Sequence, residues 1–184
     1  MNNKLHPAVF LDRDGVICRT FIRNGKPYAP SKMEDFKLMP NSHHSVMLLK
    51  QEGFKVIVVT NQPDIGNGIV ALEVVESMHQ KLRKKSMVDD VILCAHRQDE
   101  GCECRKPRPG MLIHAANKHG IDLNKSFMIG DRASDIEAGK NAGCRTVFID
   151  RHYAEPPPLN PETTVNSLQK AVAYIITNNK NKKL

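Results

Sequence analysis

Two aspartates near the amino terminus have the residue type and the spacing of a catalytic or metal-binding pair. Asp12 and Asp14 lie two positions apart, directly after the apolar run Val-Phe-Leu and before Gly15. Side chains two positions apart lie on the same side of an extended segment. The two carboxylates could therefore share a divalent cation, or act as a nucleophile and a proton donor. Taken alone, the same stretch also agrees with a solvated acidic turn.

Two further polar clusters follow apolar runs of the same kind. The β-branched run 55–59 leads into Thr60 and Asn61, and the run 126–129 leads towards Asp131. Open α/β sheets bind their ligands at the carboxyl ends of the parallel strands. If the three apolar runs are buried strands of one sheet, the three polar clusters meet at one edge and form a site.

A cysteine-rich segment predicts a structural metal site in the loop 94–107. Its two Cys-x-His and Cys-x-Cys pairs supply one nitrogen and three sulfurs. That set closes a tetrahedral Zn²⁺ site and leaves no open position for catalysis. Buried thiols beside a surface histidine are the alternative. We expect the zinc to fix the loop that carries Arg105 and Lys106 near its end. The expected ligands are Cys94, His96, Cys102 and Cys104.

The elements that must position these residues alternate between strand and helix. The pattern indicates a parallel sheet covered by helices on both faces. We expect strands at residues 8–11, 55–59, 90–94, 126–129 and 146–149. We expect helices between 42 and 53 and at residues 71–85, 110–119, 136–142 and 165–176.

The remaining segments are expected to be loops of one domain, 1–184. Residues 16–40 contain three prolines and several large apolar residues, and a loop of this length in a compact domain is usually functional. We therefore interpret them as an irregular flap beside the first aspartate. Residues 63–68 predict a turn from their Gly, Asn and Pro content, and the lysine-rich tail 179–184 is expected to be disordered.

Composition excludes several classes of protein. A chain of 184 residues with 40% hydrophobic residues buries a core without disulfides. No apolar run approaches 18 residues and no cleavable signal follows Met1, so we expect a cytoplasmic protein without a membrane partner. The net charge of +7 suits an anionic substrate or only solubility. The absence of Trp leaves little material for stacking bases, so we expect no nucleic-acid partner.

Four of these features together resemble the motifs of the haloacid dehalogenase superfamily of phosphotransferases. Their order and residue types match, and the resemblance extends from Val9 to Ile149. Within the superfamily, the chain is similar to the branch that holds heptose-bisphosphate phosphatases and histidinol-phosphate phosphatases. The stretches that carry this similarity are Asp12-Arg13-Asp14-Gly15-Val16-Ile17, Thr60-Asn61-Gln62, Cys94-Ala95-His96, Cys102-Glu103-Cys104-Arg105-Lys106-Pro107, Pro109-Gly110-Met111 and Gly130-Asp131-Arg132.

The resemblance implies a fold, a metal and a reaction. The fold would be α/β, a Rossmann-like doubly wound parallel sheet without a large cap domain. Mg²⁺ would be held by the carboxylates of Asp12 and Asp131 and by the backbone carbonyl of Asp14. Asp12 would attack phosphorus and form an aspartyl-phosphate. Asp14 would protonate the leaving alkoxide and then deprotonate the hydrolytic water.

The other motif residues would bind the phosphoryl group and the rest of the substrate. Thr60 would donate its hydroxyl to the phosphoryl oxygens, and Lys106 would bridge them to Asp12. Asp135 is either an acceptor behind the site or an acid placed at a helix amino terminus. The expected substrate-binding residues are Asn61, Arg105 and Arg132.

The implied activity is that of a Mg²⁺-dependent phosphomonoesterase. By resemblance its substrate is a phosphorylated sugar, D-glycero-D-manno-heptose 1,7-bisphosphate, cleaved at the 7-phosphate. We expect the protein to be a monomer. The five-residue gap between His96 and Cys102 keeps histidinol phosphate as an alternative substrate. A polynucleotide 3′-phosphatase and a zinc-knuckle nucleic-acid-binding module are further alternatives. Pro63 and Asp64 stand where many members of the branch have Ser-Gly, near the expected substrate entrance.

Overall fold

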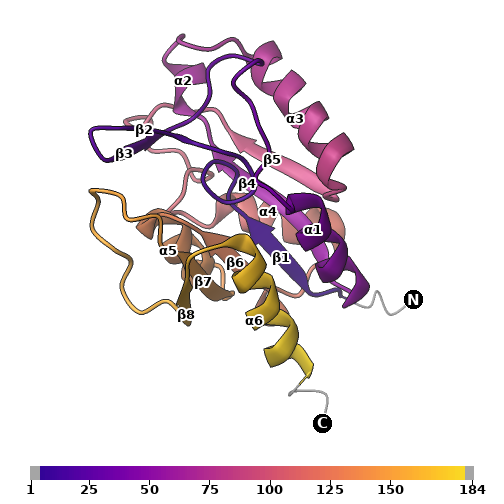
Figure 1. The fold of residues 1–184 in the computed structure, drawn as a ribbon. Helices are drawn as coiled ribbons and strands as arrows, with labels where there is room; N and C mark the ends of the chain where they lie inside the picture. Colours follow the sequence, from indigo (N-terminus) through magenta and orange to yellow (C-terminus); the bar gives the residue numbers. More distant parts are fainter. Residues whose placement is uncertain (1–4, 181–184) are drawn as a thin grey trace.

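The computed structural model describes residues 5–180, and a six-stranded parallel sheet forms its centre (Figure 1). The strands lie in the order β5-β4-β1-β6-β7-β8. The chain starts in the middle, builds outward to β5, returns to β6 and builds outward to β8. Because the direction reverses at β1, a crevice opens there at the carboxyl ends of the strands. The strands are β1 Ala8–Leu11, β4 Lys55–Asn61, β5 Asp90–Cys94, β6 Phe127–Gly130, β7 Arg145–Ile149 and β8 Thr163–Val165.

Helices cover both faces of the sheet, as expected for a doubly wound fold. Val9 and Leu11 of β1 pack in one hydrophobic cluster with α1, α3 and α6. Ala8 and Phe10 point the other way and pack with α4 and α5. Alternate residues of this strand therefore feed two separate cores. The helices are α1 Ser42–Gln51, α2 Pro63–Gly66, α3 Leu72–Ser86, α4 Gly110–His119, α5 Ala133–Asn141 and α6 Leu168–Lys180, with a 3₁₀ turn η1 Leu123–Lys125.

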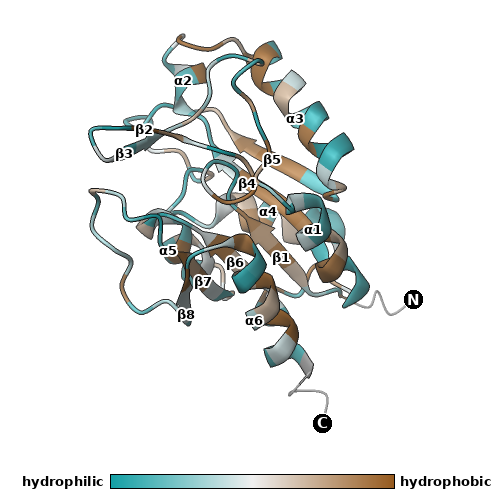
Figure 2. Cartoon of the chain, viewed as in Figure 1, coloured by the Kyte–Doolittle hydropathy of each residue, from teal (hydrophilic) through white to brown (hydrophobic). Residues whose placement is uncertain are grey.

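The distribution of apolar residues explains these two layers. All four residues of β1 are completely buried, and the central strands are brown in Figure 2 while much of the outer helices is teal. A strand buried on both faces needs a continuous apolar run, which is the pattern of parallel sheets. Within residues 5–180, no helix has both the length and the apolar character needed to span a bilayer.

The segment 16–40 is not irregular throughout, as the sequence analysis expected. It contains an antiparallel hairpin of β2 Phe21–Arg23 and β3 Lys26–Tyr28. Asn24 and Gly25 at its turn both have positive φ, 50° and 73°. Asn-Gly is the dipeptide that favours a two-residue hairpin turn, because both positions tolerate the left-handed conformation. Across residues 5–180 the segment between β1 and α1 holds nothing larger than this hairpin, so the chain has no large cap domain.

Other element boundaries differ from the sequence-based expectations. Residues 63–68 begin with the short helix α2, and α5 starts at Ala133, three residues earlier than expected. β8 was not expected, because three residues are too few for a periodic signal. Helix α6 continues to Lys180, so residues 179 and 180 of the expected disordered tail are helical. Residues 181–184 lie outside the described part of the chain.

Candidate active site

A cavity of about 530 Å³ lies at the carboxyl edge of the sheet. Strands β1 and β4 end beside it, and its walls include the cysteine-rich loop, the start of α5 and strand β3 of the hairpin. The sequence predicted that three strand ends would meet here, and they do. All seven predicted catalytic and substrate-binding residues line this cavity: Asp12, Asp14, Thr60, Asn61, Arg105, Lys106 and Arg132.

A buried lysine connects two aspartates at the floor of the cavity. Lys106 Nζ donates to Asp12 Oδ1 at 2.5 Å and to the Val59 carbonyl at 2.9 Å, and it lies 2.7 Å from Asp135 Oδ1. Burial lowers the pKa of Lys106, but the two carboxylates outweigh this effect and raise it above its ordinary value. The side chain therefore stays protonated and supplies a fixed positive charge beside Asp12.

Three carboxylates gather next to this lysine. One oxygen each of Asp12, Asp131 and Asp135 lie within 4.8 Å of one another. Burial and the two neighbouring carboxylates raise the pKa of Asp131 well above its ordinary value. Asp131 Oδ2 accepts a hydrogen bond from the Tyr153 hydroxyl at 2.6 Å, whereas Oδ1 is buried without a hydrogen-bond partner within residues 5–180. An oxygen-rich cluster with a free buried oxygen fits a hard divalent cation.

Asp135 has a different environment from the other two acids. Its Oδ1 contacts Lys106, and its Oδ2 accepts the backbone N–H of Arg132 at 3.0 Å. The side chain therefore accepts at the helix amino terminus, as one of the two sequence-based roles expected, but it lines the cavity instead of lying behind it. With both Asp135 oxygens engaged, Asp12 and Asp131 are the carboxylates better suited to hold a cation.

Gly15 allows the first catalytic loop to pack directly against Asp131. Its φ is +89°, a conformation that favours glycine. A Cβ atom at this position would lie 1.8 Å from Asp131 Oδ2 and 2.7 Å from the Tyr153 hydroxyl. Glycine is thus required at position 15, because the backbone there passes very close to the Asp131 carboxylate.

Asp14 is partly buried, and its two oxygens have unequal surroundings. Oδ2 accepts from Arg13 Nε at 3.0 Å and from Gln62 Nε2 at 2.8 Å. Oδ1 is buried and has no hydrogen-bond partner in the described part of the chain. Burial raises the pKa of Asp14, and the nearby Arg13 opposes this effect only in part. A carboxyl group with a raised pKa is suited to donate a proton.

Gln62 connects Asp14 to Thr60 and was not among the predicted site residues. Its Nε2 also donates to Thr60 Oγ1 at 2.9 Å. Because the Thr60 hydroxyl accepts this bond, its own hydrogen is available to an oxygen in the cavity. Gln62 ends the stretch Thr60-Asn61-Gln62 that carries part of the family resemblance, and this position was the signal that could have identified it.

The three expected substrate-binding residues differ in how free they are. Asn61 accepts from the backbone N–H of Lys106 and donates to its carbonyl, both at 3.1 Å, so it fixes that loop. The Arg132 guanidinium donates to Glu155 at 2.6 and 2.9 Å. Arg105 Nη1, in contrast, is buried without a hydrogen-bond partner within residues 5–180. The arginine of the cysteine-rich loop is therefore better placed to bind an anion.

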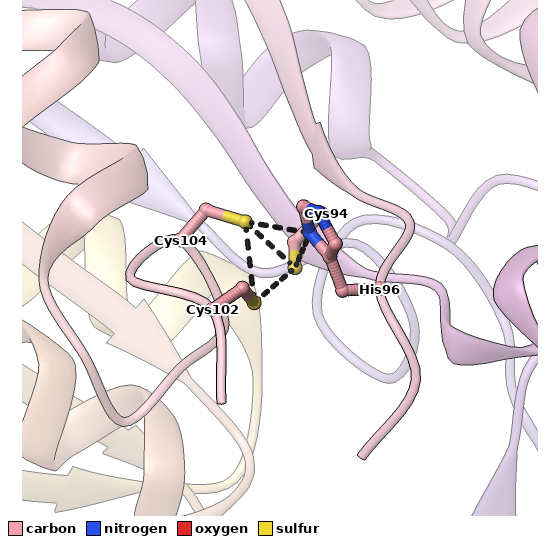
Figure 3. Close-up of side chains that lie close together, drawn as sticks. All are labelled: Cys94, His96, Cys102 and Cys104. Carbon is pink, nitrogen blue, oxygen red and sulfur yellow. Dashed lines mark hydrogen bonds between the residues drawn. The ribbon is translucent and has the colours of Figure 1, made fainter. Parts of the chain in front are cut away.

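The cysteine-rich loop brings its four predicted ligands together (Figure 3). Cys94 Sγ lies 3.0 Å from Cys104 Sγ and 3.6 Å from Cys102 Sγ, and His96 Nδ1 lies 3.2 Å from Cys104 Sγ. Tetrahedral zinc with Zn–S bonds of about 2.3 Å places its sulfurs about 3.8 Å apart. The four side chains therefore converge as the ligands of a closed metal site would, with sulfur–sulfur distances of 3.0 to 3.6 Å that are shorter than this spacing.

Comparison with known proteins identifies the family. A HAD-hydrolase-like family model matches residues 103–171. The D-glycero-beta-D-manno-heptose-1,7-bisphosphate 7-phosphatase of Helicobacter pylori is 38% identical over 141 residues, which are 73% of this chain and 78% of that protein. This chain belongs to the haloacid dehalogenase superfamily. The enzyme of the same name from Photorhabdus laumondii is 33% identical over 179 residues, covering 91% of this chain and 92% of its own length.

A solved structure agrees with this membership at the level of the fold. The D,D-heptose 1,7-bisphosphate phosphatase from B. bronchiseptica, complexed with magnesium and phosphate, aligns with a TM-score of 0.78. The alignment covers 94% of this chain and 99% of that chain at 24% sequence identity. The superfamily and the fold predicted from the sequence motifs are therefore confirmed.

Sequence reasoning missed two contributors from a distant loop. Tyr153 binds Asp131 and Glu155 pairs with Arg132, although both lie near a proline-rich stretch without a recognisable motif. No local pattern points to them, because their role depends on the path that the chain takes after β7 over the carboxyl edge of the sheet.

The close packing of Gly15 predicts an effect on stability that a matched glycine should not share. Replacing Gly15 by alanine adds strain of about 1–2 kcal/mol in the left-handed conformation and also a clash with Asp131. Gly53 has nearly the same φ, +87°, but a Cβ atom added there would have nothing within 4 Å. Denaturant unfolding should give a larger loss of free energy for Gly15→Ala than for Gly53→Ala, by about 1 kcal/mol or more. Equal losses would contradict the close contact.

Proposed function

We propose that this chain is a Mg²⁺-dependent phosphomonoesterase that acts through an aspartyl-phosphate. Its proposed substrate is D-glycero-D-manno-heptose 1,7-bisphosphate, cleaved at the 7-phosphate. The observation that carries the proposal is the arrangement of Asp12 beside the protonated Lys106, with Asp14 lining the same cavity. The names of the relatives support the choice of substrate. A cytoplasmic location, a monomeric state and the lack of nucleic-acid or membrane partners stay predictions.

The side chains divide the proposed reaction into two proton-linked steps. A phosphomonoester carries nearly two negative charges, so the approach of the Asp12 carboxylate needs positive charge nearby. Lys106 supplies it from 2.5 Å, and Thr60 lines the cavity with a free hydroxyl hydrogen for a phosphoryl oxygen. As the Asp12 oxygen bonds to phosphorus, Asp14 gives its proton to the leaving oxygen. The resulting Asp14 carboxylate then takes a proton from the water that cleaves the aspartyl-phosphate.

The donor sets suggest which residues hold the two proposed metals. Mg²⁺ would be held by the carboxylates of Asp12 and Asp131 and by the backbone carbonyl of Asp14. When bound, it would offset the charge of the carboxylates and of the phosphoryl oxygens. Zn²⁺ would occupy the closed cysteine-histidine site described above and stabilise the loop that carries Lys106.

Two cations in the cavity wall support a substrate with a second phosphate. Lys106 and Arg132 both contact carboxylates, which leaves less charge for the substrate than the sequence suggested. Arg105 and Lys26 of the β2–β3 hairpin line the cavity and make no ion pair within residues 5–180. They provide the positive charge that a bisphosphate requires beyond the reacting group.

Asp64 favours histidinol phosphate as the second candidate substrate. Its carboxylate belongs to the cavity wall and makes no ion pair in the described part of the chain. An acidic group at that place repels a second phosphate but attracts an ammonium group, which histidinol phosphate carries. The two candidates differ in the charge at the end of the substrate far from the scissile bond, so they can be separated by a direct comparison.

The Asp12→Asn variant tests the chemical step. Loss of the carboxylate removes the nucleophile but no core packing, so turnover of 4-nitrophenyl phosphate with Mg²⁺ should fall by about a thousandfold or more while the circular dichroism spectrum stays unchanged. Asp122→Asn is the matched control, because that aspartate caps the η1 turn away from the cavity. Near-normal hydrolysis by Asp12→Asn would refute an aspartyl-phosphate on this residue.

The proposed zinc site predicts a measurable metal content. Elemental analysis of protein purified without chelator should find about one zinc ion per chain, and Cys102→Ser should lower the zinc content and the Tm together. Cys144→Ser is the control, since this buried cysteine lies outside the four-ligand cluster. Protein that retains full stability without any zinc would exclude a structural role for the ion.

A substrate comparison tests the proposed function as a whole. We expect the highest kcat/KM for one anomer of the heptose 1,7-bisphosphate. Fructose 1,6-bisphosphate, histidinol phosphate and a 3′-phosphorylated oligonucleotide should all be poorer substrates. A tenfold preference for histidinol phosphate, about 1.4 kcal/mol in the transition state, would overturn the heptose assignment and leave the phosphatase chemistry standing. Release of no phosphate from any of them would overturn the enzyme assignment itself.

A further inference from the structure

A fully buried arginine lies between the proposed proton donor and helix α3. The exposed fraction of Arg13 is 0%, although isolated charged groups are rarely buried. Its Nε donates to Asp14 Oδ2 at 3.0 Å, and its Nη2 lies 2.8 Å from the same oxygen. On the other side, Nη1 lies 3.1 Å from Nε2 of His79, a residue of α3 that is also completely buried.

The chemistry of the two side chains fixes the direction of this contact. An arginine only donates hydrogen bonds, so Nε2 of His79 must accept and the ring must be neutral with its proton on Nδ1. Burial and the Arg13 charge lower the pKa of His79 to about 3, which agrees with a neutral ring. His79 therefore acts as a fixed acceptor that orients the guanidinium from behind.

The contacts of Asp14 show what this orientation achieves. Arg13 and Gln62 both use Oδ2, while Oδ1 is buried without a hydrogen-bond partner within residues 5–180. An oxygen that accepts two hydrogen bonds is a poor place for the proton of a carboxylic acid, because a hydroxyl there would turn towards two donors. Oδ1 is the oxygen left to carry a proton, and Asp14 lines the cavity in which the leaving group would lie.

We infer that Arg13 and His79 are positioning residues that hold the Asp14 carboxyl group by Oδ2, so that its proton lies on Oδ1, an inference that rests on the proposed phosphatase function. When the bond from phosphorus to the leaving oxygen breaks, the proton moves from Asp14 Oδ1 to that oxygen. Arg13 then faces the carboxylate that remains. His79 touches no substrate, and its effect reaches the reaction only through the arginine.

Arg13 also has a structural role that must be separated from this one. Its guanidinium lies 5.6 Å from the centroid of the buried Phe36 ring, so removing it would disturb packing as well as Asp14. His79 is the better position for a test, because its contact with Arg13 can be removed while an aromatic ring is kept. A purely structural role would lower stability but would affect all substrates alike.

The experiment compares two substrates that differ in their need for a proton. An alkyl phosphate leaves as a strongly basic alkoxide, whereas 4-nitrophenolate leaves readily without protonation. With His79→Phe, the ratio of kcat/KM for the alkyl phosphate to that for 4-nitrophenyl phosphate should fall by about tenfold or more. His79→Gln, which restores an acceptor, should bring the ratio to within about threefold of the wild type.

Controls separate this inference from stability and from the proposed function. Leu82→Val removes packing from the same buried face of α3 and should lower the Tm without changing the ratio. If His79→Phe does not fold, Arg13→Lys, which keeps the charge but loses the fork of donors, must lower the ratio instead. An unchanged ratio in the folded variant overturns the inference alone, provided that the wild type hydrolyses both substrates. A wild type inactive on both overturns the proposed function.

Discussion

The contact between Lys106 and the carboxylates of Asp12 and Asp135 is the interaction on which the site depends. Two buried carboxylates within 4.8 Å of one another repel strongly, and the ammonium group between them offsets this repulsion. The backbone of Lys106 is held by two hydrogen bonds with the Asn61 side chain at the end of β4. The cysteine-rich loop supplies the other support, since it begins at the end of β5 and ends at this lysine.

The order of the strands explains why residues far apart in the chain converge. β1 lies at the centre, so the loop with Asp12 and Asp14 is flanked by the end of β4 on one side and the end of β6 on the other. Asp131 and Asp135, which follow β6, and Thr60 of β4 therefore approach Asp12 and Asp14 from opposite sides. A scaffold of buried parallel strands holds these ends rigidly, which is what a reaction with a short-lived charged transition state requires.

Two segments outside the motifs contribute to the wall of the cavity, the β2–β3 hairpin and the loop after β7. The hairpin tip accepts the backbone N–H of Ala154 at the Gly25 carbonyl, with a distance of 2.8 Å. In the same loop after β7, Arg151 donates to the Gly15 carbonyl at 2.9 Å and Tyr153 donates to Asp131. The loop is thus attached both to the hairpin and to the catalytic turn. Because these contacts use backbone groups and distant side chains, they form only when the whole fold is in place.

The sequence by itself determined several strands of the sheet, the acids of the candidate site and the grouping of the cysteine and histidine residues, because these depend on local patterns. β1 and β5 were predicted with their observed limits, and Cys94, His96, Cys102 and Cys104 were grouped by spacing alone. Only the tertiary structure decided which charged side chains are paired with a neighbouring side chain and which can contact a substrate. Arg132 is paired with Glu155, and His79 supports Arg13 across 66 positions of the chain. Such partners are set by how loops and helices pack over the sheet, and neither periodicity nor motif spacing records that packing.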